Sequence, residues 1–134
     1  MHGIDHVLRT MTFEFFGTGK HKIEMEKLLE TEKAVFLDVR AVPEVESVQL
    51  RLEHHMRVLH IPTDEIPDRV DEIPRDGTVG IFCSAGTRSA IAYAYLRANG
   101  FENVRLVLGG YEAVTNLVKP GKLLKHIEMS RDSE

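Results

Sequence analysis

The chain has 134 residues, of which 43% are hydrophobic and 28% charged, and its formal net charge is −4. This length suits one domain that buries about two-thirds of the surface exposed by its unfolded form. The negative charge argues against a nucleic-acid-binding protein, and no apolar stretch approaches the ~18 residues of a membrane span. A single cysteine rules out an internal disulfide. We therefore expect a cytoplasmic protein with neither a nucleic acid nor a membrane as partner.

The N-terminal segment, residues 1–21, carries a short aromatic patch. Phe13, Phe15 and Phe16 lie close together there, and acidic residues interrupt the patch. Two interpretations stay open for these side chains. They either cover the core of the domain or form a docking surface, which could join two copies in a homodimer.

Short apolar and β-branched runs alternate with segments of helical spacing along the rest of the chain. Residues 22–31 and 90–99 have the spacing of helices, and Asn99-Gly100 is typical of a left-handed cap at the end of the second. The acidic run 64–72 indicates a solvated helix face. The alternation predicts an α/β fold with parallel strands and crossover helices. The expected strands are residues 34–39, 57–61, 78–82 and 104–108.

Cys83 stands between the third predicted strand and the helix that follows it. The first amides of a helix lack intrahelical acceptors and favour negative charge, so a thiolate there should have a lowered pKa. Gly86 allows positive φ angles that turn successive N–H groups toward one sulfur, and Arg88 adds a permanent positive charge. The loop predicts an anion-binding pocket around a reactive sulfur. The alternative is a cysteine buried as a small hydrophobe at a strand end.

Four motifs stand in order along the chain: Leu37-Asp38-Val39-Arg40 with Pro43-Glu44, His60-Ile61-Pro62, Cys83-x-x-Gly86-x-Arg88-Ser89, and Leu108-Gly109-Gly110-Tyr111-Glu112-Ala113. These motifs resemble those of the rhodanese-like sulfurtransferases. The resemblance implies an open parallel β-sheet flanked by helices on both faces, with the domain at residues 22–127 and a C-terminal tail at 128–134. Two departures stand out, since residues 53–58 keep only His54 of the usual Gly-His-Ile-Pro-Gly-Ala and Val114 replaces a usual Trp.

The resemblance implies transfer of sulfane sulfur by double displacement, without a cofactor. Cys83 takes a sulfur from a small anionic donor such as thiosulfate and passes it from a persulfide to an acceptor, which is cyanide in vitro and a thiol or sulfur carrier in the cell. Arg88 is the second catalytic residue and orients the donor. The Thr87 and Ser89 hydroxyls either contribute to the site or cap the helix. The loop amides expected to bind substrate belong to Ser84, Ala85, Gly86, Thr87 and Ser89.

Other functions remain as alternatives. A sulfur carrier or interaction module would receive persulfide from a partner and turn over little thiosulfate. A cysteine-dependent phosphatase or arsenate reductase fits less well, because phosphatases place five residues between cysteine and arginine, and four separate Cys83 from Arg88. A metal site is not expected, since no second cysteine or His-Glu-x-x-His pattern accompanies His54, His55 and His60.

Asp38 and Arg40 end the first predicted strand, at the sheet edge where Cys83 is also expected. If the two strands are neighbours, Asp38 or Arg40 could brace the Cys83 loop through hydrogen bonds or charge. The alternative is a strand-end aspartate that caps a turn and a solvated arginine.

Overall fold

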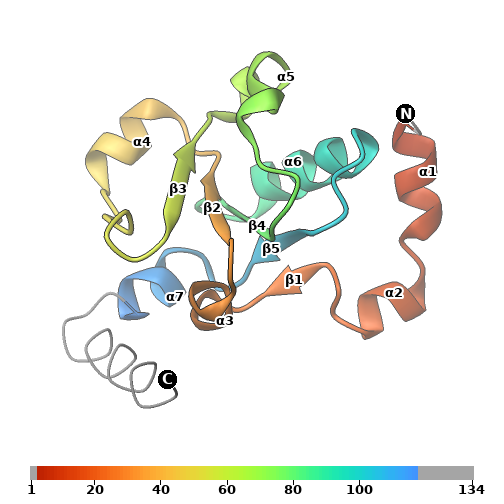
Figure 1. Cartoon of the computed structure of the whole chain (residues 1–134), viewed down its shortest axis with the longest axis horizontal. Helices are drawn as coiled ribbons and strands as arrows, with labels where there is room; N and C mark the ends of the chain where they lie inside the picture. Colours follow the sequence, from red (N-terminus) through yellow and green to blue (C-terminus); the bar gives the residue numbers. More distant parts are fainter. Residues whose placement is uncertain (1–2, 118–134) are drawn as a thin grey trace.

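A computed structural model describes residues 3–117 of the chain. Its strands form one parallel sheet in the order β1-β5-β4-β2-β3, as Figure 1 shows. The strands of this sheet are β1 (Lys22–Ile23), β2 (Val35–Asp38), β3 (Arg57–His60), β4 (Val79–Phe82) and β5 (Val104–Val107). The four predicted strands are confirmed to within one residue at each end, because apolar runs of this length suit strands buried on both faces.

Helices cover both faces of the sheet (Figure 1). Leu37 and Ile81 point to one face, where α5 and α6 supply Ile66, Tyr93 and Leu96 to a common core. Phe36 and Phe82 point to the other face, toward side chains of α3 and α7. The predicted α/β fold with helices on both faces is therefore confirmed. The helices are α1 (Gly3–Thr10), α2 (Phe13–Gly17), α3 (Met25–Glu30), α4 (Val42–Ser47), α5 (Ile66–Arg69), α6 (Thr87–Ala98) and α7 (Gly110–Leu117).

Two predicted helices differ in their bounds from the observed ones. The segment 22–31 begins as β1, because the amides of Leu106 and Leu108 donate to the carbonyls of His21 and Ile23. Helix α3 starts only at Met25. The acidic run 64–72 folds as the short helix α5 between two 3₁₀ turns, Thr63–Glu65 and Val70–Glu72. Helix α6 begins at Thr87 and ends beside Asn99, and Gly100 has the expected left-handed backbone, with φ of 88°.

The N-terminal segment packs onto the domain through α1 and α6. Val7 is fully buried, and the Thr10 hydroxyl accepts a hydrogen bond from Arg97. Phe15 packs against the core between α6 and the sheet (the α6-side core), whereas Phe13 is 95% exposed. The aromatic patch is thus divided between core and surface. Residues 118–127 of the predicted domain and the predicted tail lie outside the described residues, and among residues 3–117 no helix is long and apolar enough to cross a membrane.

Candidate active site

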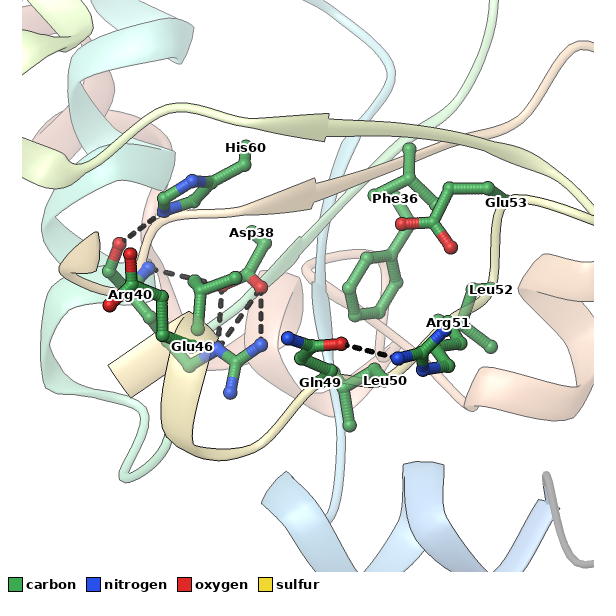
Figure 2. Close-up of a pocket in the computed structure, with 12 residues that line it drawn as sticks. Phe36, Asp38, Arg40, Glu46, Gln49, Leu50, Arg51, Leu52, Glu53 and His60 are labelled. Atoms are coloured by element: carbon green, nitrogen blue, oxygen red, sulfur yellow. Dashed lines mark hydrogen bonds and ion pairs between the residues drawn. The ribbon is translucent and has the colours of Figure 1, made fainter. Parts of the chain in front are cut away.

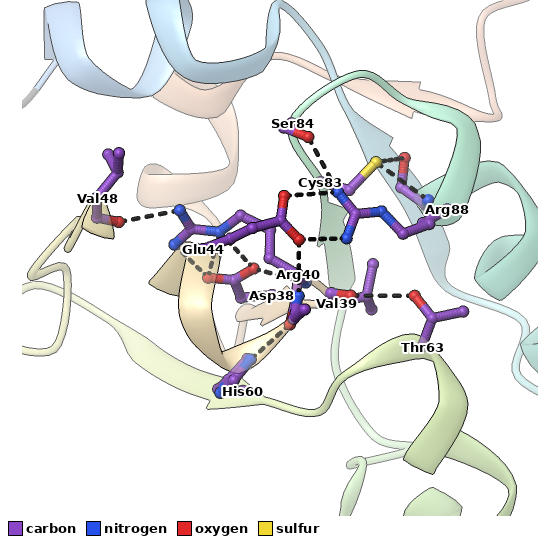
Figure 3. A network of polar contacts seen from close by, with 12 residues as sticks. Asp38, Val39, Arg40, Glu44, Val48, His60, Thr63, Cys83, Ser84 and Arg88 are labelled. Carbon is purple, nitrogen blue, oxygen red and sulfur yellow. Dashed lines mark hydrogen bonds and ion pairs between the residues drawn. The ribbon is translucent and has the colours of Figure 1, made fainter. Parts of the chain in front are cut away.

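Strands β2 and β4 are neighbours, so their carboxyl ends meet at one edge of the sheet. Asp38 pairs with Phe82 across the two strands, and the Val39 amide donates to the Phe82 carbonyl over 3.0 Å. Cys83 follows Phe82 directly. The sequence left open whether these two strands are neighbours, and the structure shows that they are. Figure 3 shows Asp38, Arg40 and Cys83 in one view of this region.

The loop after β4 wraps around the sulfur of Cys83. Its Sγ accepts hydrogen bonds from the backbone amides of Gly86 at 3.0 Å and Ser89 at 3.3 Å. Gly86 has a left-handed backbone, with φ of 88°, and serves as the N-cap of α6. That conformation costs glycine little and reverses the chain, so amides from the loop and from the first turn of the helix converge on one atom.

The electrostatics of this site favour the thiolate. Burial raises the pKa of the Cys83 thiol, which is only 4% exposed and packs in the α6-side core. Hydrogen bonds from the Ser89 hydroxyl and from the amides of Ser89, Gly86 and Ala85 lower that pKa by more, so the net shift is below the ordinary value. The cysteine is buried, as the alternative interpretation required, but its sulfur is held by donors that stabilise negative charge.

The Ser89 hydroxyl can follow the protonation state of the sulfur. Its Oγ lies 3.3 Å from Cys83 Sγ and 3.0 Å from the Gly86 carbonyl oxygen. In the thiol form, Cys83 donates to Ser89 Oγ and the hydroxyl donates to the carbonyl. In the thiolate form, the hydroxyl proton turns to the sulfur. Ser89 is buried and therefore belongs to the sulfur site, whereas the exposed Thr87 side chain makes no hydrogen bond within residues 3–117.

Arg88 extends from the first turn of α6 to Glu44 on α4 (Figure 3). Its Nη1 and Nη2 donate to the two carboxylate oxygens of Glu44 over 2.5 and 2.8 Å, and Nη2 also donates to Ser84 Oγ over 3.0 Å. The bond from Arg88, with a second from the Ala41 amide, lowers the pKa of Glu44 to about 2. The Pro43-Glu44 motif of the sequence gives no indication that Glu44 contributes to the site.

Asp38 and Arg40 form a buried network beside the Cys83 loop. Arg40 is 1% exposed; its Nε donates to both carboxylate oxygens of Asp38, at 2.9 and 3.0 Å, and its Nη2 donates to one of them at 2.6 Å. The Nη1 of Arg40 donates to the Val48 carbonyl and to the Tyr111 hydroxyl. The backbone carbonyl of Arg40 hydrogen-bonds with Nε2 of the His60 ring. Burial lowers the pKa of Arg40, but the bonds to Asp38 and Tyr111 raise it by more. The interpretation of Arg40 as a solvated arginine is wrong.

The Asp38–Arg40 pair reaches the Cys83 loop indirectly. In the described part of the chain, neither side chain hydrogen-bonds to residues 83–89. Arg40 instead holds Tyr111, which follows Gly110, and a Cβ at Gly110 would stand 3.1 Å from the Ser84 carbonyl oxygen. A bracing role for this pair stays a prediction, and the Gly109-Gly110 turn offers one route for it.

Comparison of the sequence with known protein families gives a match to the family model of the rhodanese-like domain over residues 22–117. The chain belongs to the rhodanese-like domain family. The predicted resemblance is thus confirmed, and it covers the sheet, α3 to α7 and the Cys83 loop.

Relatives of this rhodanese-like protein include a sulfurtransferase and a protein named as a candidate sulfur carrier. A sulfurtransferase of Allochromatium vinosum is 34% identical over 85 residues, which covers 63% of this chain and 75% of that protein. YrkF of Bacillus subtilis, named as a candidate sulfur carrier protein, is 32% identical over 85 residues, which covers 63% of this chain and 43% of that protein. The crystal structure of a rhodanese-related protein from Thermoplasma volcanium has a TM-score of 0.61 at 27% identity, covering 75% of this chain and 95% of that one.

A separate pocket of about 370 Å³ lies beside the Asp38–Arg40 pair, and both side chains contribute to its lining (Figure 2). Glu46, Gln49 and Arg51 line it together with Phe36, and Cys83 does not. This pocket of the rhodanese-like domain is therefore distinct from the candidate active site. Residues 3–117 contain no group of three or more His, Cys, Asp or Glu side chains that could hold a metal ion.

Proposed function

We propose that this rhodanese-like protein is a sulfurtransferase that carries sulfane sulfur on Cys83. The observation that supports this proposal is the convergence of the Gly86 and Ser89 amides on the Cys83 sulfur, which lowers its pKa. A thiolate is the form of cysteine that attacks sulfur, and donors that stabilise it also stabilise a persulfide anion. The family match and the Allochromatium relative favour the same chemistry.

The first half-reaction forms the persulfide. The Cys83 thiolate attacks the outer sulfur of thiosulfate, a new S–S bond forms, and the S–S bond of thiosulfate breaks with its electron pair leaving on sulfite. The product is a Cys83 persulfide whose negative charge rests on the outer sulfur. The inward-facing amides of Ala85, Gly86 and Ser89 would stabilise that charge.

The second half-reaction returns the enzyme to its starting state. A nucleophilic acceptor attacks the outer sulfur, and the Cys83 thiolate leaves. Cyanide gives thiocyanate in the test tube, and a thiol or a sulfur-carrier protein is the acceptor we propose for the cell. No redox cofactor is needed, because the sulfur atom moves between nucleophiles and the two half-reactions balance.

The decisive experiment measures thiocyanate formation from thiosulfate and cyanide by the parent protein and by Cys83→Ser. Intact mass is recorded after exposure to thiosulfate alone. The proposal predicts turnover and a mass gain of one sulfur (~32 Da) in the parent, both absent from the folded variant. Turnover that persists in Cys83→Ser would contradict it.

A sulfur carrier is the second candidate, and the comparison with YrkF favours it. A carrier would accept sulfur from a protein persulfide but turn over thiosulfate slowly. Repeating the mass measurement with a persulfide donor separates the candidates. A carrier gains one sulfur from that donor yet forms little thiocyanate from thiosulfate and cyanide in steady state.

A further inference from the structure

The positive charge of the Cys83 loop is already engaged by a carboxylate. A guanidinium has five N–H donors, and three of those of Arg88 are directed at Glu44 and Ser84. Both terminal nitrogens take part, so the planar fork that would grip an oxyanion in bidentate fashion is occupied by the Glu44 carboxylate. An anionic donor that approaches Cys83 meets an ion pair rather than a free arginine.

The position of Glu44 makes this arrangement specific. Glu44 belongs to α4, which follows β2, whereas Arg88 belongs to α6, which follows β4. The ion pair therefore links the segments after two neighbouring strands, and Arg88 also bonds Ser84 beside Cys83 (Figure 3). Its carboxylate also accepts from the Ala41 amide at the start of its own helix. Both side chains are about one third exposed, so solvent and approaching solutes can reach the pair.

We propose that Glu44 is a specificity-determining residue that selects the sulfur donor by charge. It disfavours dianionic donors such as thiosulfate relative to donors with one negative charge, such as alkyl persulfides and thiosulfonates. This inference rests on the proposed sulfurtransferase function. A pKa of about 2 keeps Glu44 ionised throughout the pH range of an assay, so the selection does not depend on pH there.

Coulomb's law gives the proposal a quantitative form. The repulsion between Glu44 and a donor is proportional to the charge of the donor. Removal of the carboxylate charge should therefore lower the barrier for a dianion about twice as much as for a monoanion. Because rates depend exponentially on the barrier, the rate increase for the dianion should be about the square of the increase for the monoanion.

Thiosulfate and methanethiosulfonate form a suitable pair of donors. Each presents a terminal sulfur to the Cys83 thiolate, and attack gives the same persulfide. The S–S bond of thiosulfate breaks to release sulfite, and that of methanethiosulfonate breaks to release methanesulfinate, each leaving group taking the electron pair. The donors differ by one unit of charge, so the ratio of their rates cancels changes in the nucleophilicity of Cys83.

The test uses Glu44→Gln, which removes the charge but keeps an oxygen that can accept from the Ala41 amide. The matched control is Glu46→Gln, because Glu46 is an exposed carboxylate on the same helix that lines the separate pocket. The rate of persulfide formation is measured for each donor in a single turnover. We expect Glu44→Gln to increase the rate of persulfide formation about tenfold with thiosulfate and about threefold with methanethiosulfonate. Glu46→Gln should leave the ratio of the two rates unchanged.

A second pair of variants protects the test against a misfolded protein. Arg88→Gln leaves the Glu44 carboxylate without Arg88 and should slow persulfide formation from thiosulfate more than from methanethiosulfonate. The double variant with Glu44→Gln should restore the ratio of these two rates found in the parent. Equal changes for the two donors in Glu44→Gln, or a slower reaction with thiosulfate, would overturn the proposal and leave Glu44 as a residue that only positions Arg88. If no variant forms a persulfide from either donor while the parent also forms none, the proposed function itself fails.

Discussion

Two polar regions lie at the same edge of the sheet and use their charges differently. In the Asp38–Arg40 network, a buried carboxylate and a buried guanidinium satisfy each other, and the remaining donors of Arg40 reach a carbonyl and a hydroxyl. In the Cys83 loop, backbone amides converge on one sulfur that has no ionic partner within hydrogen-bond range among residues 3–117. Paired full charges hold the first region together, whereas unpaired backbone dipoles prepare the second for an anion.

The largest effect should come from breaking the buried pair. Asp38→Ala leaves the charge of Arg40 buried without its partner, and the free energy of unfolding should fall by about 3–5 kcal/mol. Urea denaturation measures this loss. Asp68→Ala, an exposed aspartate on α5, is the control and should change stability by less than about 0.5 kcal/mol. Unchanged stability and sulfur transfer in Asp38→Ala would remove the bracing role from this pair.

The strands and the nucleophilic loop could be predicted because their signals are local. Each of the four-residue strands β2 to β5 lies in a short run rich in apolar residues. The Cys83 loop contains its nucleophile, its glycine and its hydroxyl within seven consecutive residues. Strand β1 could not be predicted, since two residues show no periodicity and its pairing with β5 joins positions about eighty residues apart.

The contacts between loops could not be predicted from the sequence. Glu44 and Arg88 are 44 positions apart, and Tyr111 is 71 positions from Arg40. Both contacts depend on how the segments after different strands fold toward each other, which periodicity does not encode, and β4 lies between the strands that precede Tyr111 and Arg40. For the same reason, Arg88 was expected to face the donor, and its engagement by Glu44 emerged only from the structure.

The left-handed conformation of Gly86 directs the loop amides at the sulfur of Cys83. Gly86→Ala meets no atom within 4 Å, yet its φ of 88° is strained for any residue with a Cβ. We expect a stability loss of about 1–2 kcal/mol and a fall of about tenfold in thiocyanate formation, because the loop relaxes away from Cys83. Gly17→Ala, which also has free space but no positive φ, should leave activity unchanged. Full activity in Gly86→Ala would show that the left-handed turn is dispensable.

A smaller effect should follow from cutting the link between the two regions. Tyr111→Phe removes the hydroxyl that accepts from Arg40, and unfolding should become easier by about 1 kcal/mol. Tyr95→Phe is the control, because the Tyr95 hydroxyl makes no side-chain hydrogen bond within residues 3–117. The rate of Cys83 alkylation, measured alongside stability, shows whether the network acts on the loop. A change in both quantities supports bracing through the Gly-Gly turn, and a change in stability alone confines the network to the scaffold.

The smallest predicted effect lies within the sulfur site. The thiolate fraction of Cys83 rises as the pH rises through its pKa, and the lowered pKa places the midpoint of alkylation by iodoacetamide below that of an ordinary cysteine. Ser89→Ala removes a hydroxyl that favours the thiolate, so the midpoint should move to higher pH. At a pH below the parent midpoint, the alkylation rate should fall about threefold.

Thr87→Ala in the same loop is the matched control for Ser89→Ala, because its hydroxyl is exposed and makes no hydrogen bond in the described part of the chain. Alkylation rates between about pH 5 and pH 10 give the two midpoints. If Ser89→Ala titrates like the parent, the backbone amides alone set the pKa of Cys83. The Ser89 hydroxyl would then serve the Gly86 carbonyl in both protonation states, and the site would resemble the Asp38–Arg40 network in keeping its side-chain hydrogen bonds for structure.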